Sequence, residues 1–275
     1  MSVRISLPFV STILAAVVAL PAAIPHRAPT AGVAERGLAV LQHFNDSLPR
    51  NAGNGLRCTS CHLDDGLRGS AMSWVAVTAR YPKYRARRGG PETIEQRVNE
   101  CITRSLAGRM LGEDDQAMKD IVAYFESLRQ MPVPSRPDTV RVAGDTIRGE
   151  EKYAANCTRC HGARGQGAVS PAVLGAQSYS IGAGLARQSV LATFLKWNMP
   201  YDMAGSLADQ DAADIAAWVL RQPRQDHPGK ELDWPNGDAP ADVAYATNAA
   251  AARGLPSPPR RPLLRRRVSP RPVSK

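Results

Sequence analysis

The sequence is poor in aromatic residues, in cysteine and in long apolar runs. Aromatic side chains make up 5% of the 275 residues, and the five cysteines are too few for a disulfide scaffold and odd in number. Only the N-terminus carries a long apolar run, which argues against a protein with many membrane spans. Hydrophobic residues still make up 43% of the chain. This fraction is sufficient for real cores and argues against global disorder.

Acidic residues are absent from the last 25 residues, and this absence explains most of the net charge. Residues 251–275 contain eight Lys or Arg, so the remainder of the chain carries about +2 of the formal charge of +10. A nearly neutral body does not indicate nucleic acid as a partner. The same segment contains six prolines and little to bury, and we predict a disordered basic tail at 246–275. A role in docking an acidic acceptor protein or anionic lipid stays open.

The first 23 residues have the features of an export signal. One early cation, Arg4, precedes an apolar stretch at 7–20 and then small residues and proline. The stretch is too short for a membrane span of about 20 apolar residues, and three prolines between residues 8 and 25 disfavour a buried helix. We predict a signal peptide at 1–23 and a periplasmic mature protein without an integral membrane domain. Retention of the segment as an anchor is the alternative.

The rest of the chain contains a duplication. A predicted helix at 37–45 is followed by Cys58-Thr59-Ser60-Cys61-His62, and a predicted helix at 149–156 is followed by Cys157-Thr158-Arg159-Cys160-His161. Each half closes with an amphipathic helix, at 115–129 and at 209–220. The chain is therefore expected to form two related helical domains.

The two C-x-x-C-H motifs are the attachment signal for c-type haem. In each, two thiols add to the haem vinyl groups and the adjacent histidine ligates the iron. A zinc site requires four ligands, and neither half offers a second cysteine pair. A thioredoxin-like redox pair requires one motif in a βαβ context, whereas here two copies lie in helical surroundings. We predict two covalently bound haem c groups, held by Cys58, Cys61, His62, Cys157, Cys160 and His161.

These motifs and the helices around them define the predicted fold, which is all-α. One cytochrome c-type domain at 31–131 contains haem 1, and a second at 141–245 contains haem 2. Three prolines in the segment between them prevent a helix and predict a stiff linker at 132–140.

The sixth position of the second iron has two methionine candidates. Met199 and Met203 lie 38 and 42 residues after His161, on a loop with Pro and Gly. A thioether ligand gives a raised potential, which suits onward electron transfer. We favour Met199 because Pro200 fixes the loop beside it. Lys196 is a weaker candidate, because ligation requires a neutral amine.

Cys101 is the cysteine that the haem motifs leave over. It has no intramolecular disulfide partner, and an exported chain has reason to lose an unused thiol. It follows His62 by 39 residues, nearly the distance that separates the second histidine from Met199. Thiolate ligation of the first iron is the favoured interpretation, and a thiolate lowers the haem potential. The alternative is a buried thiol that only packs, with Met72, Met110 or His43 as the iron ligand.

Basic residues surround Cys101 in the sequence. Between Arg80 and Arg97, Glu92 and Glu95 are the only acids. Guanidinium groups near a reactive sulfur bind a small oxyanion of the sulfate shape and orient it for attack. A solvated charged face is the alternative. The cations are Arg80, Lys83, Arg85, Arg87, Arg88, Arg97 and Arg104.

The residues around Cys101 are similar to those of a known family. Tyr-Arg-Ala-Arg-Arg-Gly at 84–89 and Gln-Arg-Val-Asn-Glu-Cys-Ile-Thr-Arg-Ser-Leu-Ala-Gly at 96–108 resemble the dihaem thiosulfate dehydrogenases. That family is related to the catalytic subunit of the SoxAX sulfur-oxidising cytochromes. The segments at 53–63 and 233–245 are similar too, and the resemblance covers residues 37–245, without the signal segment or the tail.

The resemblance implies His/Cys ligation of haem 1 and the oxidative coupling of two thiosulfates to tetrathionate. Carried over to this chain, it makes Cys101 the haem 1 ligand and the reaction centre. It places Arg87, Arg97 and Ser105 at active-site positions and Met199 at the haem 2 methionine. Some members have a lysine directly before that methionine, whereas this chain has Asn198.

The expected mechanism follows from electron counting, because joining two sulfane sulfurs releases two electrons and two haems hold one each. Cys101 bonds the first thiosulfate, and a second thiosulfate then releases tetrathionate. Electrons pass from haem 1 via haem 2 to an external acceptor, and the reverse reaction stays open. Two other functions are an electron-transfer cytochrome without a substrate and a SoxA-like subunit that loads sulfur onto a carrier protein.

Overall fold

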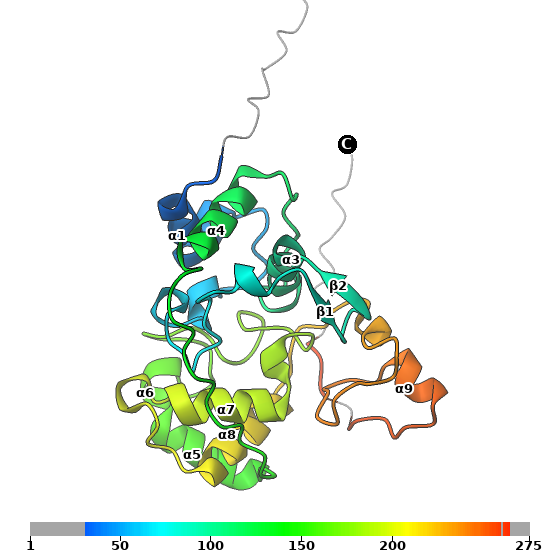
Figure 1. Ribbon diagram of the computed structural model, residues 1–275. Coiled ribbons are helices and arrows are strands. Elements are labelled where there is room, and N and C mark those ends of the chain that lie inside the picture. Colours follow the sequence, from blue (N-terminus) through cyan, green and yellow to red (C-terminus); the bar gives the residue numbers. More distant parts are fainter. Residues whose placement is uncertain (1–30, 260, 265–275) are drawn as a thin grey trace, which may run out of the picture.

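The computed structural model describes residues 31–259 and 261–264, and the signal peptide predicted for 1–23 lies outside the described residues. Two helical domains lie one above the other, with an extended linker between them and a C-terminal arm at their side (Figure 1). Besides one two-stranded hairpin, the described chain is helices and loops, so the all-α prediction is confirmed. No helix among these residues is long and apolar enough to cross a membrane.

The first domain is built around two crossing helices, α1 (Ala34–Gln42) and α4 (Gln116–Ser127). At the crossing, a Cβ on Gly37 would come within 2.0 Å of the Asp120 carbonyl oxygen, so only glycine permits this approach. The elements between these helices are α2 (Phe44–Ser47), η1 (Cys58–Ser60), η2 (Asp64–Gly66), η3 (Thr78–Arg80), the antiparallel strands β1 (Lys83–Arg85) and β2 (Gly90–Glu92), and α3 (Ile94–Arg104).

The second domain repeats this crossing with α5 (Thr146–Asn156) and α8 (Asp209–Arg221). Here a Cβ on Gly149 would come within 2.0 Å of the Asp214 carbonyl oxygen. The elements between the two helices are α6 (Thr158–His161), η4 (Gly184–Ala186), α7 (Gln188–Asn198) and η5 (Tyr201–Met203). The duplication expected from the sequence is therefore present in space.

A buried aspartate fixes each helix crossing in the same way. Asp120 and Asp214 each accept hydrogen bonds from the backbone N–H before the first helix, from an arginine on that helix and from a glutamine on the last helix. The donors are Val33, Arg36 and Gln116 for the first domain and Asp145, Arg148 and Gln210 for the second. Because hydrogen bonds to a charged acceptor are strong, each aspartate locks its helix pair.

The two domains contact each other directly. Asn198, which is fully buried, accepts a hydrogen bond from the Ser70 hydroxyl (2.8 Å) and donates to the Ser70 carbonyl (3.1 Å). The Tyr201 hydroxyl donates to Asp64 (2.9 Å), and the Arg68 guanidinium lies 4.5 Å from the Tyr201 ring centroid. These contacts join the loop after the first C-x-x-C-H motif to the loop after α7.

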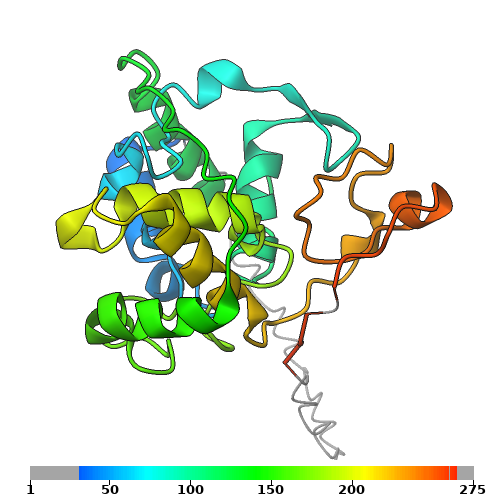
Figure 2. The ribbon, with the colours of Figure 1, turned by 90° about the horizontal axis from the view of Figure 1, so that it is seen from below.

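The chain after α8 forms an arm that returns to the first domain, beside the hairpin β1–β2 (Figure 2). It contains η6 (Lys230–Leu232) and α9 (Asn248–Ala252). The Trp234 backbone N–H donates to the Arg87 carbonyl (2.8 Å), and the Asn236 amide donates to the Tyr84 hydroxyl (2.8 Å). The arm therefore covers one face of the first domain.

The first part of the tail differs from the predicted disorder. Residues 248–252 form α9, because four alanines favour a helix and the Thr247 hydroxyl accepts the Ala250 N–H (3.3 Å). Further on, Arg261 donates to the Ala186 carbonyl (3.0 Å) and the Leu264 N–H donates to the Arg224 carbonyl (2.9 Å). The expectation for 265–275 lies outside the described residues.

Candidate haem sites and active site

The two motif histidines are held by the same contact. The Nδ1 atom of His62 lies 2.7 Å from the Met72 carbonyl oxygen, and that of His161 lies 2.7 Å from the Pro171 carbonyl oxygen. A carbonyl only accepts, so Nδ1 carries the proton and donates it in both rings. Nε2 of each ring is then the atom available to a metal.

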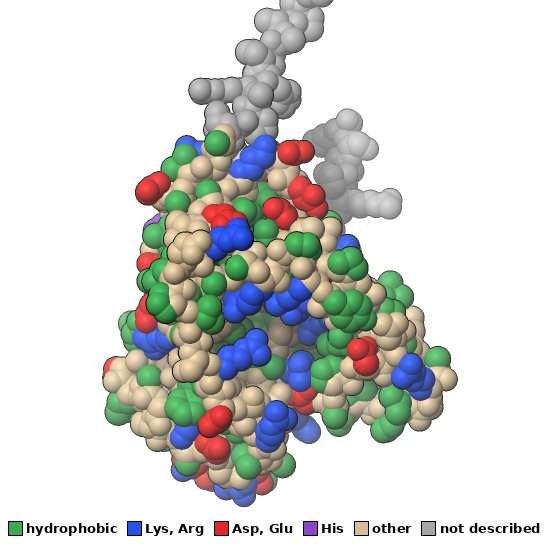
Figure 3. All heavy atoms as spheres, in the orientation of Figure 1, with side chains coloured by type: hydrophobic (Ala, Val, Ile, Leu, Met, Phe, Trp, Pro, Cys, Tyr) green, Lys and Arg blue, Asp and Glu red, His purple; other side chains and the backbone are tan. Residues whose placement is uncertain are grey.

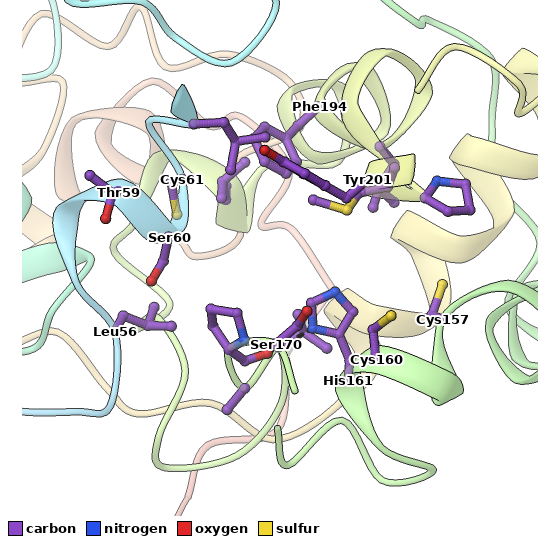
Figure 4. Close-up of a pocket in the computed structure, with 18 of the residues that line it drawn as sticks. Leu56, Thr59, Ser60, Cys61, Cys157, Cys160, His161, Ser170, Phe194 and Tyr201 are labelled. Atoms are coloured by element: carbon purple, nitrogen blue, oxygen red, sulfur yellow. Dashed lines mark hydrogen bonds between the residues drawn. The ribbon is translucent and has the colours of Figure 1, made fainter. Parts of the chain in front are cut away.

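A cavity of about 830 Å³ adjoins the second motif. Cys157, Cys160 and His161 lie on one side of it, and Met199, apolar side chains of α7 and α8 and residues of the first domain line other parts. Cys61 and Ser60 of the first motif lie across the opening from the second motif (Figure 4). Met203 is 52% exposed and does not line the cavity. Lys196 donates to the Leu207 carbonyl (2.5 Å) instead of reaching the cavity.

Two buried polar side chains beside this cavity fit an anionic prosthetic group. Tyr179, which lines the cavity, is 4% exposed, and its hydroxyl has no hydrogen-bond partner among the described residues. The guanidinium of Arg224 lies 3.8 Å from the Tyr179 ring centroid, is buried, and bonds only to backbone carbonyls among the described residues. An uncompensated buried cation is costly. A carboxylate-bearing group such as haem compensates it, so these residues fit the group that the motif predicts.

The first motif lies against the aromatic core of its domain. The His62 ring stacks on Trp74 at 4.7 Å between centroids, and Trp74 packs on Tyr124 and Phe125 of α4. Burial, and to a lesser extent the charge of Arg97, lowers the pKa of His62 to about 4, although the contact with the Met72 carbonyl opposes the shift. The ring is therefore neutral at pH 7, which is the form that ligates iron.

Cys101 lies close to this motif. It is half-buried on α3, and its charge contributes, after burial, to the raised pKa values of both Cys58 and Cys61. The electrostatic interaction with Cys101 is also the largest cause of the raised pKa of Arg97. Arg97 therefore lies within electrostatic reach of His62 and of Cys101. Among the described residues, Cys58, Cys61 and Arg97 are therefore electrostatic neighbours of Cys101.

The alternative ligands for the first iron lie elsewhere. Met72 is 40% exposed and its backbone carbonyl supports His62, while Met110 is 66% exposed. His43 is exposed and lines the cavity of the second motif. None of the described residues forms a group of three or more His, Cys, Asp or Glu arranged around a metal ion, so the zinc alternative finds no ligand set in them.

A second cavity, of about 320 Å³, lies between the hairpin, η4, α7 and the C-terminal arm. Figure 3 shows Lys and Arg side chains gathered around a hollow between the two domains. Four arginines line the cavity, and no acid does; Arg85, Arg87 and Arg97 come from the first domain and Arg187 from the second. Its remaining lining residues are Tyr84, Ala86, Gly184, Val190, Trp234 and Pro240.

The four arginines differ in how they are paired. Arg97 contacts Glu100 (3.2 Å), Arg187 contacts Asp242 (2.7 Å), and Arg85 lies 3.3 Å from Glu92. Arg87 forms no ion pair with any described residue; it donates to the Gly182 carbonyl (2.7 Å) and stacks on Trp234, 4.6 Å from the ring centroid. Burial lowers the pKa of Arg87, and no carboxylate of a described residue pairs with it directly to offset the cost of burying its charge.

The structure thus brings together three of the four predicted active-site residues. Arg87 and Arg97 line one cavity, and Cys101 lies one helical turn beyond Arg97 on α3. Ser105 follows one turn later, and its hydroxyl neither lines the cavity nor makes a hydrogen bond to another described residue. The sequence reasoning missed Arg187, Tyr179 and Arg224, which are distant in sequence from both motifs.

Comparisons with known proteins match a family model to part of each domain. A family model described as the SoxA/TsdA cytochrome c domain matches residues 49–133. A model described as cytochrome c oxidase, cbb3-type, subunit III, matches residues 144–219. Cytochrome c domains imply covalently bound haem c.

Curated relatives and a solved structure share one name. A thiosulfate dehydrogenase from Psychrobacter arcticus is 41% identical over 76% of this chain and 68% of its own length. One from Allochromatium vinosum is 38% identical over 69% of this chain and 77% of its own length. Thiosulfate dehydrogenase (TsdBA) from Marichromatium purpuratum superposes with a TM-score of 0.67 at 28% identity; the match covers 71% of this chain and 47% of that one, so this chain spans about half of it. The chain belongs to the thiosulfate dehydrogenase family of c-type cytochrome enzymes.

Proposed function

We propose that this protein is a periplasmic dihaem cytochrome that couples two thiosulfates to tetrathionate at Cys101. The observation that carries the proposal is the position of Cys101, between the first C-x-x-C-H motif and an arginine that lines a cationic cavity. A sulfur nucleophile beside an anion site is the arrangement that this reaction requires, because the substrate is a small sulfur-containing dianion.

The haem groups are proposed to be held by residues of both domains. Cys58, Cys61, His62 and Cys101 would hold haem 1. The second motif, with His161, and Met199 would hold haem 2, which is supported by the contacts that orient both histidines and by Met199 in the cavity lining. Bound haem c supplies two one-electron acceptors, one for each electron that the coupling releases.

The chemistry at Cys101 is covalent catalysis in two steps. In the first, the Cys101 thiolate and one thiosulfate lose two electrons and form a Cys–S–S–SO₃⁻ adduct. In the second, the sulfane sulfur of another thiosulfate attacks the adduct sulfur that bears the sulfonate. The bond between Sγ of Cys101 and that sulfur breaks, tetrathionate leaves, and the thiolate is restored. Charge balances in both steps, and no proton is transferred.

The arginines of the cavity make these encounters possible. Thiosulfate carries two negative charges and the adduct carries one, so the second step brings like charges together. Arg87, which lacks a carboxylate partner, and Arg97, which neighbours Cys101, are proposed to bind the sulfonate oxygens. Ser105 is proposed to donate a hydrogen bond to the same anion when substrate is bound. The two bound haems would supply the route by which the electrons pass to an external acceptor.

Thiosulfate-dependent reduction of the haems in the purified holoprotein tests this function, with tetrathionate measured in the same sample. We expect reduction by the native protein and a loss of at least about 100-fold in Cys101→Ala, because a covalent route is removed. Reduction by a small chemical reductant is the control that both proteins carry competent haems. Unchanged reduction of Cys101→Ala by thiosulfate contradicts the proposal, and a native protein that is inert with thiosulfate alone favours the sulfur-loading subunit.

A further inference from the structure

The C-terminal arm orients arginines of both domains. Trp234 stacks on Arg87, and Asp233 accepts two hydrogen bonds from Arg104, at 2.8 and 2.7 Å. Asp242 accepts from Nε of Arg187 at 2.7 Å. The segment 233–245 therefore forms a third wall of the cationic cavity, in addition to the walls from the two domains.

Arg187 is the cation of this cavity that the second domain contributes. It lies directly before α7, and its side chain is 26% exposed. Asp242 is itself held by the backbone N–H of Ser189 (3.0 Å) and by the Ser189 hydroxyl (2.5 Å). The carboxylate therefore has a fixed orientation, and of the three guanidinium nitrogens of Arg187 it accepts a hydrogen bond only from Nε. The two Nη groups remain for the cavity, which Arg187 lines.

The proposed reaction requires two anion positions, and the arginines divide accordingly. Arg97 is the electrostatic neighbour of Cys101 and belongs to the first domain, as does Arg87. Both come from the segment 87–97, whereas Arg187 comes from the opposite domain. A dianion that attacks the adduct needs a cation on its own side, because the cations beside the adduct already compensate the first sulfonate.

We propose that Arg187, positioned by Asp242, forms the subsite for the second thiosulfate, which attacks the Cys101 adduct and leaves as half of tetrathionate. This inference rests on the proposed function. Arg187 binds the sulfonate of the incoming dianion and holds its sulfane sulfur toward the adduct. Formation of the first Cys–S bond does not need it, so the two steps depend on different arginines.

Separate measurements of the two steps in the Arg187→Gln holoprotein test this proposal. The first is the fraction of protein that carries a thiosulfate adduct, read by intact mass after rapid mixing with thiosulfate and acid quench. The second is steady-state tetrathionate formation with a small artificial acceptor. We expect adduct formation at the native rate, accumulation of the adduct at steady state, and a loss of about 10- to 100-fold in turnover at low thiosulfate, since one charge-assisted hydrogen-bonding group is removed.

Two further variants distinguish a subsite from a structural role. Arg187→Lys keeps the positive charge but lacks the two parallel N–H donors of the guanidinium group. We expect its turnover at low thiosulfate to lie between those of Arg187→Gln and the native protein. Asp242→Asn is expected to raise KM for thiosulfate more than it lowers kcat, because Asp242 orients Arg187 without contacting substrate. Arg221, which is exposed on α8, provides the matched control Arg221→Gln, with native kinetics expected.

The outcomes separate the subsite from the function on which it rests. Native turnover and no accumulated adduct in Arg187→Gln overturn the subsite while leaving the proposed function intact. Failure of the native protein to form either adduct or tetrathionate overturns the function itself. Equal slowing of adduct formation and turnover in Arg187→Gln also overturns the subsite, because it places Arg187 in the first step.

Discussion

Replacement of Asn198 by alanine is expected to weaken the junction between the two domains. The side chain is fully buried and makes three hydrogen bonds, two with Ser70 of the first domain and one to the Phe194 carbonyl of its own helix. Each contributes about 1 kcal/mol net, so Asn198→Ala is expected to lower the free energy of unfolding by about 2–3 kcal/mol. For a chain of this size the loss corresponds to about 4–12 °C in Tm.

The same change is expected to reach haem 2, because Asn198 directly precedes Met199. Without its anchor on Ser70, the loop at 199–203 is less constrained, and the proposed methionine ligation weakens. Thermal unfolding followed by circular dichroism measures the first effect, and the visible absorption band of methionine-ligated ferric haem measures the second. Asn248→Ala is the matched control, because Asn248 is exposed and its side chain bonds to no other described residue. A native Tm in Asn198→Ala refutes the reasoning.

Three further changes test other parts of the structure. Gly149→Ala places a Cβ about 2.0 Å from the Asp214 carbonyl oxygen, so we expect the free energy of unfolding to fall by about 1–3 kcal/mol. Denaturant unfolding measures this change, and an unchanged unfolding midpoint contradicts the close packing. Met199→Leu is expected to lower one haem potential in a redox titration, while Met203→Leu leaves both unchanged; the opposite pattern contradicts the choice of ligand. Burial alone would raise the pKa of Asp120, but its hydrogen bonds and the charge of Arg36 outweigh burial, so the pKa is lowered in the folded protein. The ionised carboxylate therefore stabilises the folded state above about pH 3.9, and this stabilisation is lost in more acidic solution. Asp120→Asn is therefore expected to flatten the acid limb of the Tm–pH curve, and an unaltered limb contradicts this.

The fold was accessible from the sequence because its signals are local and repeated. Two C-x-x-C-H motifs, each preceded and followed by amphipathic helices, define a pair of similar domains without knowledge of any contact. The helices at 94–104 and 188–198 were less apparent, since no motif marks them. The first has a recognisable signal nonetheless, because Thr93 and Gln96 form a capping box at its start.

The candidate site was only partly accessible, because it depends on contacts between distant segments. Arg87 and Arg97 lie within 15 residues of Cys101, so the sequence alone indicates them as candidates for the site around that cysteine. Arg187 is an isolated cation in sequence and joins the cavity only through the packing of the second domain and the arm. Its partner Asp242 lies in a segment whose composition indicates a loop, and pairing across 55 residues has no local signature.

Peptide mapping of Cys101 tests the central claim most directly. The native holoprotein is mixed with thiosulfate and an electron acceptor, quenched in acid during turnover, digested without reductant and analysed by mass spectrometry. The account predicts a thiosulfate-derived S–SO₃⁻ group on Cys101, with Cys58, Cys61, Cys157 and Cys160 bound to haem. Steady tetrathionate formation with Cys101 unmodified at every quench time contradicts it.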